Sequence, residues 1–115
     1  MIILYILDKE HNILPVEKEG MEAWGEWHKK IGNRTVKKEK IGETEISTVF
    51  LGMDHGFGNV RPVLFETMVF GPLDPDNEIQ ERCCTWDEAL IQHEQVKQLL
   101  LDRLKSEQNT PTTTT

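Results

Sequence analysis

The fold of this chain is decided by the stretch STVFLGMDHGFG, residues 47–58, which is followed closely by PVLFETMVFG, residues 62–71. Two runs rich in apolar and β-branched residues, each typical of a strand, stand on either side of a glycine-rich turn that carries Asp54 and His55. The second run places a carboxylate, Glu66, among apolar residues. Because a buried carboxylate without partners is costly, we expect Glu66 to be held by hydrogen bonds.

Upstream of this stretch, the pattern alternates between strand and helix. Residues 2–7 are apolar on both faces, which predicts a strand inside a sheet. Pro15 is suited to open a helix whose apolar residues recur at helical spacing until Gly32 and Asn33 end it. Residues 35–41 and 44–53 then read as a β-hairpin.

Downstream, residues 79–83 predict a short strand, and the sequence from Thr85 to Glu88 is a capping box that opens a second helix. An apolar stripe continues to Leu104, so this helix should lie on the sheet. Residues 106–115 have no apolar period and end in four threonines, which predicts a disordered tail.

The element order β-α-β-β-β-β-α predicts an α+β two-layer sandwich, with an antiparallel sheet of about five strands and two helices on one face. At 115 residues the chain is expected to form one domain over residues 1–105. The strand at 62–70 is apolar on both sides, so its second face needs a cover. A second copy of the chain is the simplest cover, and we expect a homodimer.

Composition limits the classes of protein to which this chain can belong. Hydrophobic residues make up 37% and charged residues 29%, and no apolar run approaches the roughly 20 residues of a membrane span. No secretory leader is expected at the start, and the adjacent Cys83 and Cys84 do not suggest a disulfide framework, so a cytoplasmic protein is expected.

The formal net charge of −7 argues against general nucleic-acid binding. Residues 28–40 nevertheless hold six Lys or Arg side chains against one Glu. This basic segment is interpreted as a solvated face whose lysines guard an exposed strand edge, or alternatively as a site for a small anionic ligand such as a nucleotide.

Four residues could form a polar site: Asp54, His55, Glu66 and His93. The set His55, Glu66 and His93 could hold a divalent metal, and a histidine beside a carboxylate could transfer a proton. No dedicated metal motif occurs, and no other cofactor is indicated. The alternative is a buried network in which His93 pairs with Glu66 or Asp54, while Asp54 caps backbone amides.

A second candidate site combines Trp24 and Trp27 with Lys37 and Lys38, which could bind a planar anionic ligand by stacking and charge. The two tryptophans are three residues apart and share a helix face. They could equally be core or dimer contacts.

Taken together, the patterns YILD at 5–8, STVFLGMDH at 47–55, LFETMVFG at 64–71 and TWDEA at 85–89, with His93 beyond, resemble a family of small proteins encoded by tailed bacteriophages and prophages. The resemblance covers roughly residues 1–100. It implies a phage origin and a place in the cytoplasm of the host bacterium, and it implies no mechanism.

The expected function is a non-enzymatic accessory protein that binds a host protein or a small ligand, with an inhibitory role in counter-defence or host takeover. A small metal-dependent or acid–base hydrolase using the four polar residues is the alternative enzyme hypothesis. A purely structural dimeric scaffold is the third.

Overall fold

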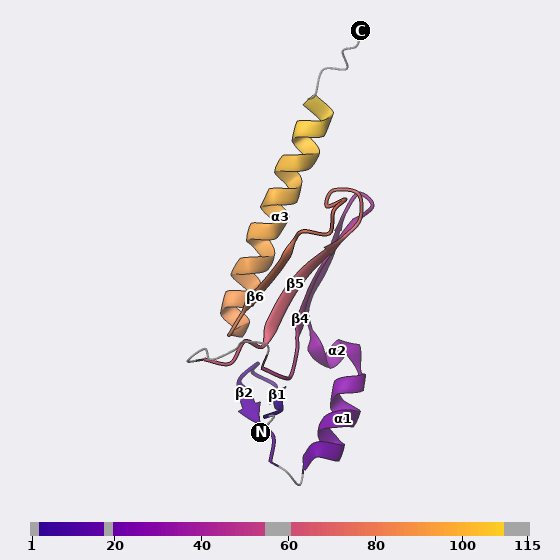
Figure 1. Ribbon diagram of the computed structural model, residues 1–115. Helices are drawn as coiled ribbons and strands as arrows, with labels where there is room; N and C mark the ends of the chain where they lie inside the picture. The colour runs from indigo at the N-terminus through magenta and orange to yellow at the C-terminus, as the bar shows by residue number, and fades with distance from the viewer. Residues whose placement is uncertain (1–2, 18–19, 55–60, 110–115) are drawn as a thin grey trace.

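The computed structural model describes residues 3–17, 20–54 and 61–109. Four strands form one antiparallel sheet in the order β3-β4-β5-β6, namely β3 (Thr35–Ile41), β4 (Thr44–Phe50), β5 (Phe65–Phe70) and β6 (Gln80–Cys83). The long helix α3 (Trp86–Asn109) lies along one face of this sheet and contacts all four strands (Figure 1). The α+β class with a helix layer on an antiparallel sheet is therefore confirmed.

Strand alternation decides which side chains meet α3. In β4 every second residue is buried, and the partners Ile46↔Val69 and Phe50↔Phe65 face the helix together. Val96 and Leu100 of α3 pack against the first of these pairs. At the other end of the sheet, Phe50 and Phe65 join a second core cluster below the start of α3.

The first strand does not belong to the four-stranded sheet, so the expected sheet of about five strands is corrected to four. β1 (Tyr5–Leu7) pairs instead with β2 (Ile13–Pro15) in a separate antiparallel hairpin. The Asp8 carboxylate accepts the backbone amides of Glu10 and Asn12, and this turn folds β2 back onto β1. Pro15 consequently ends a strand and does not open a helix.

The first helix is shorter than predicted and is followed by a second one. α1 spans Met21–Lys29, and the short α2 spans Ile31–Arg34, so Gly32 and Asn33 lie inside a helix. In Figure 1 α1 lies beyond the lower end of the sheet, at a distance from α3. Of the described helices, α3 alone runs along the strands, where two helices on one face were expected.

The start of α3 confirms the predicted capping box. The Glu88 amide donates to the Thr85 hydroxyl at 3.1 Å, and the Thr85 amide donates to the Glu88 carboxylate at 3.1 Å. The helix continues to Asn109, past the expected start of the tail at residue 106. Residues 110–115 of the predicted tail lie outside the described residues, and no described helix is long and apolar enough to cross a membrane.

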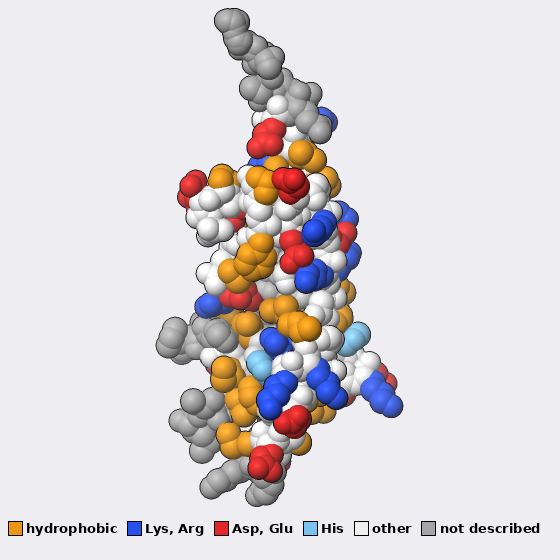
Figure 2. Space-filling model, turned by 90° about the vertical axis from the view of Figure 1, so that its right-hand side faces the viewer, with side chains coloured by type: hydrophobic (Ala, Val, Ile, Leu, Met, Phe, Trp, Pro, Cys, Tyr) orange, Lys and Arg blue, Asp and Glu red, His pale blue; other side chains and the backbone are white. Residues whose placement is uncertain are grey.

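The face of the sheet opposite α3, called the open face here, is covered by no described helix or strand. Strand register places alternate residues of all four strands on it. These residues are Lys38, Lys40, Glu45, Ser47, Val49, Glu66, Met68, Phe70, Gln80 and Arg82. Figure 2 looks toward this face and shows hydrophobic side chains in its middle with charged side chains beside them.

Candidate functional site

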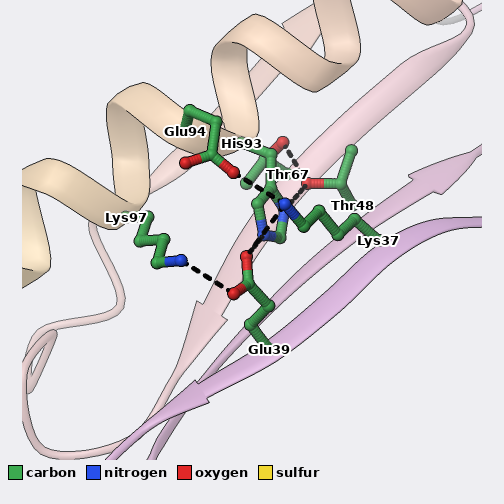
Figure 3. Close-up of polar contacts among 7 residues, drawn as sticks. All are labelled: Lys37, Glu39, Thr48, Thr67, His93, Glu94 and Lys97. Carbon is green, nitrogen blue, oxygen red and sulfur yellow. Dashed lines mark hydrogen bonds and ion pairs between the residues drawn. The ribbon is translucent and has the colours of Figure 1, made fainter.

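His93 stands at the centre of a buried polar network between α3 and the sheet (Figure 3). Its ring has no exposed surface. Nδ1 lies 2.7 Å from the Thr48 hydroxyl on β4, and Nε2 lies 2.8 Å from the Glu39 carboxylate on β3. The Thr48 hydroxyl is in turn 2.7 Å from that of Thr67 on β5, so one histidine ties the helix to three strands.

The direction of these hydrogen bonds follows from counting donors. The Gln92 amide donates to the Thr67 hydroxyl oxygen at 3.0 Å, which leaves the Thr67 proton free to point toward Thr48. Thr48 can then donate to Nδ1 of His93, and Nε2–H donates to Glu39. The chain Gln92, Thr67, Thr48, His93, Glu39 is thus complete when Nδ1 of His93 accepts and Nε2 donates.

Charged side chains close the outer side of this network. Lys97 donates to the second carboxylate oxygen of Glu39 at 2.9 Å, and Lys37 bridges Glu94 at 2.7 Å and Glu39 at 3.5 Å. The hydrogen bonds from Lys97 and then from His93 lower the pKa of Glu39 to about 2. Glu39 is therefore an ionised carboxylate with both oxygens occupied.

The order hydroxyl, imidazole, carboxylate is also the order of a hydrolase triad, which makes the network a candidate for chemistry. Thr48 and His93 have no exposed surface, however, and a nucleophile must be reached by its substrate. No buried side-chain polar atom in the described part of the chain is left without a partner. These contacts hold α3 in register on the sheet, as a structural role for His93 predicts, with Glu39 as the carboxylate in place of Glu66 or Asp54.

The predicted polar site does not assemble among its described members. Register places Glu66 on the open face, while His93 lies on the opposite side of the sheet. Asp54 accepts the backbone amide of Val63 at 2.7 Å, a capping role, and His55 lies outside the described residues. Within the described ranges, no group of three metal-ligating side chains comes together.

Glu66 does have the hydrogen-bond partners that its apolar surroundings required. Its carboxylate accepts from Arg82 Nε at 3.0 Å and from Gln80 Nε2 at 2.7 Å, both on the neighbouring strand β6. The residue is only 9% exposed. This cross-strand ion pair explains how β5 keeps a carboxylate between apolar neighbours.

A cavity of about 390 Å³ lies between α1 and the β1–β2 hairpin. Its lining is almost entirely apolar and includes both predicted tryptophans. The residues around it are Ile6, Pro15, Val16, Glu17, Gly20, Ala23, Trp24 and Trp27. Its volume falls within the range of roughly 300–1,000 Å³ that small-molecule sites occupy.

The two indole rings of this cavity are held in place by the protein. Trp24 Nε1 donates to the Tyr5 carbonyl at 2.9 Å, and its ring stacks on His28 with centroids 4.4 Å apart. His28 is anchored to the Leu51 carbonyl at 3.0 Å. Trp27 packs edge-on against Phe50, with ring centroids 5.8 Å apart. The cavity wall is thus preorganised.

The lysines expected beside the tryptophans lie elsewhere. Lys37 and Lys38 are neighbours on β3 and point to opposite faces of the sheet: Lys37 binds Glu94, and Lys38 lies 3.6 Å from Glu45. Neither is among the described residues that line the tryptophan cavity. The predicted site that combined stacking with charge is therefore not formed as one unit. Its two tryptophans line the cavity, and its two lysines lie on β3.

Sequence reasoning missed Glu39, Thr48 and Thr67 as partners of His93. The signal was present in the alternation of β4 and β5, which places both threonines in the same phase as Ile46 and Val69. Glu39 is the one acidic residue in a basic segment, and it shares a face with those core positions. Matching His93 on the helix to these core-facing strand positions would have identified the three residues as its partners.

Comparisons with protein-family models, curated proteins and solved structures find nothing that matches this chain.

Proposed function

We propose that this chain is a non-enzymatic binding protein, and that its ligand is a small, flat, largely apolar molecule held in the cavity between α1 and the β1–β2 hairpin. The single observation that carries the proposal is the cavity itself, with two anchored indole rings in a wall that is otherwise aliphatic apart from Glu17. Tryptophan faces and edges provide large contact areas to planar molecules.

Two features of the structure support a binding role over a catalytic role. Two described residues of the predicted acid–base site are engaged in structural contacts: His93 in the helix–sheet network and Glu66 in a cross-strand ion pair. The described part of the cavity lining, by contrast, has one carboxylate residue, Glu17, and no histidine or cysteine. Such a lining selects a ligand by shape and apolar contact.

The resemblance to small phage and prophage proteins indicates where the proposed binding protein would act. We infer an accessory protein that works in the host cytoplasm and sequesters its ligand there. Sequestration requires a stoichiometric protein with a stable site and no chemistry, and the anchored cavity wall supports such a role.

The test uses nuclear magnetic resonance of the three tryptophan indole N–H groups, with neutral bicyclic aromatic fragments as probes. Binding in the cavity should shift the Trp24 and Trp27 signals and leave Trp86, which lies at the start of α3, as an internal reference. Ala23→Phe fills the cavity and should abolish the shifts. Glu22→Phe adds the same ring next to the cavity on α1 and should leave them.

Shifts confined to Trp86, or fragment binding that is unchanged in Ala23→Phe, would contradict the cavity as the ligand site. Release of a chemically altered fragment during the titration would contradict a binding role and would revive the hydrolase hypothesis.

A further inference from the structure

We propose that the open face of the sheet is a self-association surface on which a second copy of this chain packs its own open face. This inference concerns a different surface from the tryptophan cavity and does not depend on the proposed ligand. It is carried by the apolar content of the face, by its charge and by its shape.

The open face carries three apolar side chains, Val49, Met68 and Phe70, where a sheet face that meets water is ordinarily polar. Met68 lies on the central strand β5, between Ser47 and Gln80 on the flanking strands, and Phe70 lies two residues further along β5. Phe70 is 49% exposed. Val49 on β4 extends this apolar strip toward the other end of the sheet.

The charges of the open face favour another copy as the occupant. Lys38, Lys40 and Arg82 stand against Glu45 and Glu66, so the face carries +1 in a chain of −7. Because the rest of the chain carries a net charge of −8, two copies repel each other overall, even though Lys29, Lys30 and Arg34 give the end of α1 and α2 a local positive charge. The open face is a nearly neutral surface on which two copies can approach without that repulsion.

Four of these five charges are paired with each other within the face. Glu66 pairs with Arg82 at 3.0 Å, and Glu45 lies 3.6 Å from Lys38. A partner therefore need not supply counter-charges, and a nearly neutral face offers little attraction to a strongly basic or acidic macromolecule. Apolar contact through Met68, Phe70 and Val49 remains as the attraction, and an identical face provides it.

The shape fits a symmetric sandwich. Antiparallel sheets pack face to face about 10 Å apart, and a two-fold axis makes such a contact self-complementary. In Figure 1 α3 lies on the other side of the sheet from the open face. A dimer through the open face would therefore have four layers, with an α3 on the outside of each sheet. Four strands of about six residues give roughly 400 Å² per copy, below the roughly 800 Å² of a standard interface, so the dimer should dissociate on dilution.

Sedimentation equilibrium over a dilution series tests the proposal. At high concentration the full chain should reach twice the 13.3 kDa mass of one copy, and it should return to one copy on dilution. Met68→Lys should raise the dissociation constant at least tenfold. Ile91→Lys is the matched control, because Ile91 is 59% exposed on α3, away from the open face, and this change should leave the constant unaltered.

A second measurement keeps the proposal falsifiable if Met68→Lys disturbs folding. In a mixture of isotope-labelled and unlabelled wild-type chains, nuclear Overhauser effects between chains should involve the methyl groups of Met68 and Val49. A chain that stays monomeric at every concentration would overturn the proposal. A dimer whose inter-chain contacts map to α3 or to the β3 edge would overturn it as well.

Discussion

At the scale of single residues, His93 shows how a helix is fixed on a sheet by polar contacts. Both ring nitrogens are occupied, and each partner, Thr48 and Glu39, comes from a different strand. Hydrogen bonds are directional and apolar contacts are not, so His93 adds a directional constraint to the position that core packing gives α3. Helix register therefore depends on a few polar atoms.

Thr48→Val should lower the free energy of unfolding by about 1–3 kcal/mol, because the valine has the same shape but leaves Nδ1 of the buried His93 without a donor. Thr35→Val is the control: the Thr35 hydroxyl donates to the Ile31 carbonyl at an exposed site, where water can replace it, and the loss should stay below about 1 kcal/mol. Urea denaturation measures the free energy of unfolding of both variants. Equal losses in the two variants would show that the His93 network contributes nothing particular.

At the scale of elements, the connection after β5 is as constrained as the strand itself. Gly71 has a φ of +142°, and a Cβ atom there would lie 2.6 Å from the Cα of Thr44 at the start of β4. Thr44 is itself buried, and its hydroxyl accepts the Leu73 amide at 3.0 Å. The close approach of these two backbones lets the chain leave β5 and cross the end of the sheet.

Gly71→Ala should therefore destabilise the protein by more than about 2 kcal/mol, since backbone atoms cannot move aside as a flexible side chain could. Gly42→Ala is the matched comparison. Gly42 also has a positive φ, of +61°, but open space surrounds the position of its Cβ, so only the conformational cost of about 1 kcal/mol applies. Thermal unfolding of the two variants should rank them in this order, and the reverse order would contradict the contact with Thr44.

At the scale of the whole molecule, the ion pairs that surround His93 make global stability depend on pH. The pKa of Glu39 falls from its ordinary value of 4.5 to about 2 in the folded protein. Between these two values the unfolded chain binds a proton that the folded chain does not. The contribution of Glu39 to stability is thus complete above about pH 4.5 and is lost as the pH falls toward 2.

Glu39→Gln should consequently make the unfolding free energy less steep with pH between 4.5 and 2, while lowering it at neutral pH, where Lys97 loses its partner. Glu22→Gln, at an exposed position of α1, should keep the wild-type slope. Denaturant unfolding at a series of pH values gives both curves. A wild-type slope in Glu39→Gln would mean that other carboxylates account for the acid sensitivity.

Local patterns in the sequence are strong enough to predict the parts of this fold that depend on neighbouring residues. The capping box of Thr85 and Glu88 forms as expected, because its hydrogen bonds join residues three apart. The antiparallel strands from β3 to β6 follow one another in chain order, so alternation and turns suffice to predict them. The need of Glu66 for partners also followed from its apolar neighbours alone.

What the sequence by itself determined is thus the α+β class, the start of the long helix and the requirement that Glu66 be paired. Only the tertiary structure decided that β1 pairs with β2 outside the main sheet and that His93 meets Glu39, 54 residues away in the chain. The physical reason is that the strand pattern places Glu66 in the sheet and the helix pattern places His93 against it. Neither pattern says on which face of the sheet each residue lies. A shift of one residue in strand register moves every side chain to the other face, and that choice is made by packing of the whole core against α3.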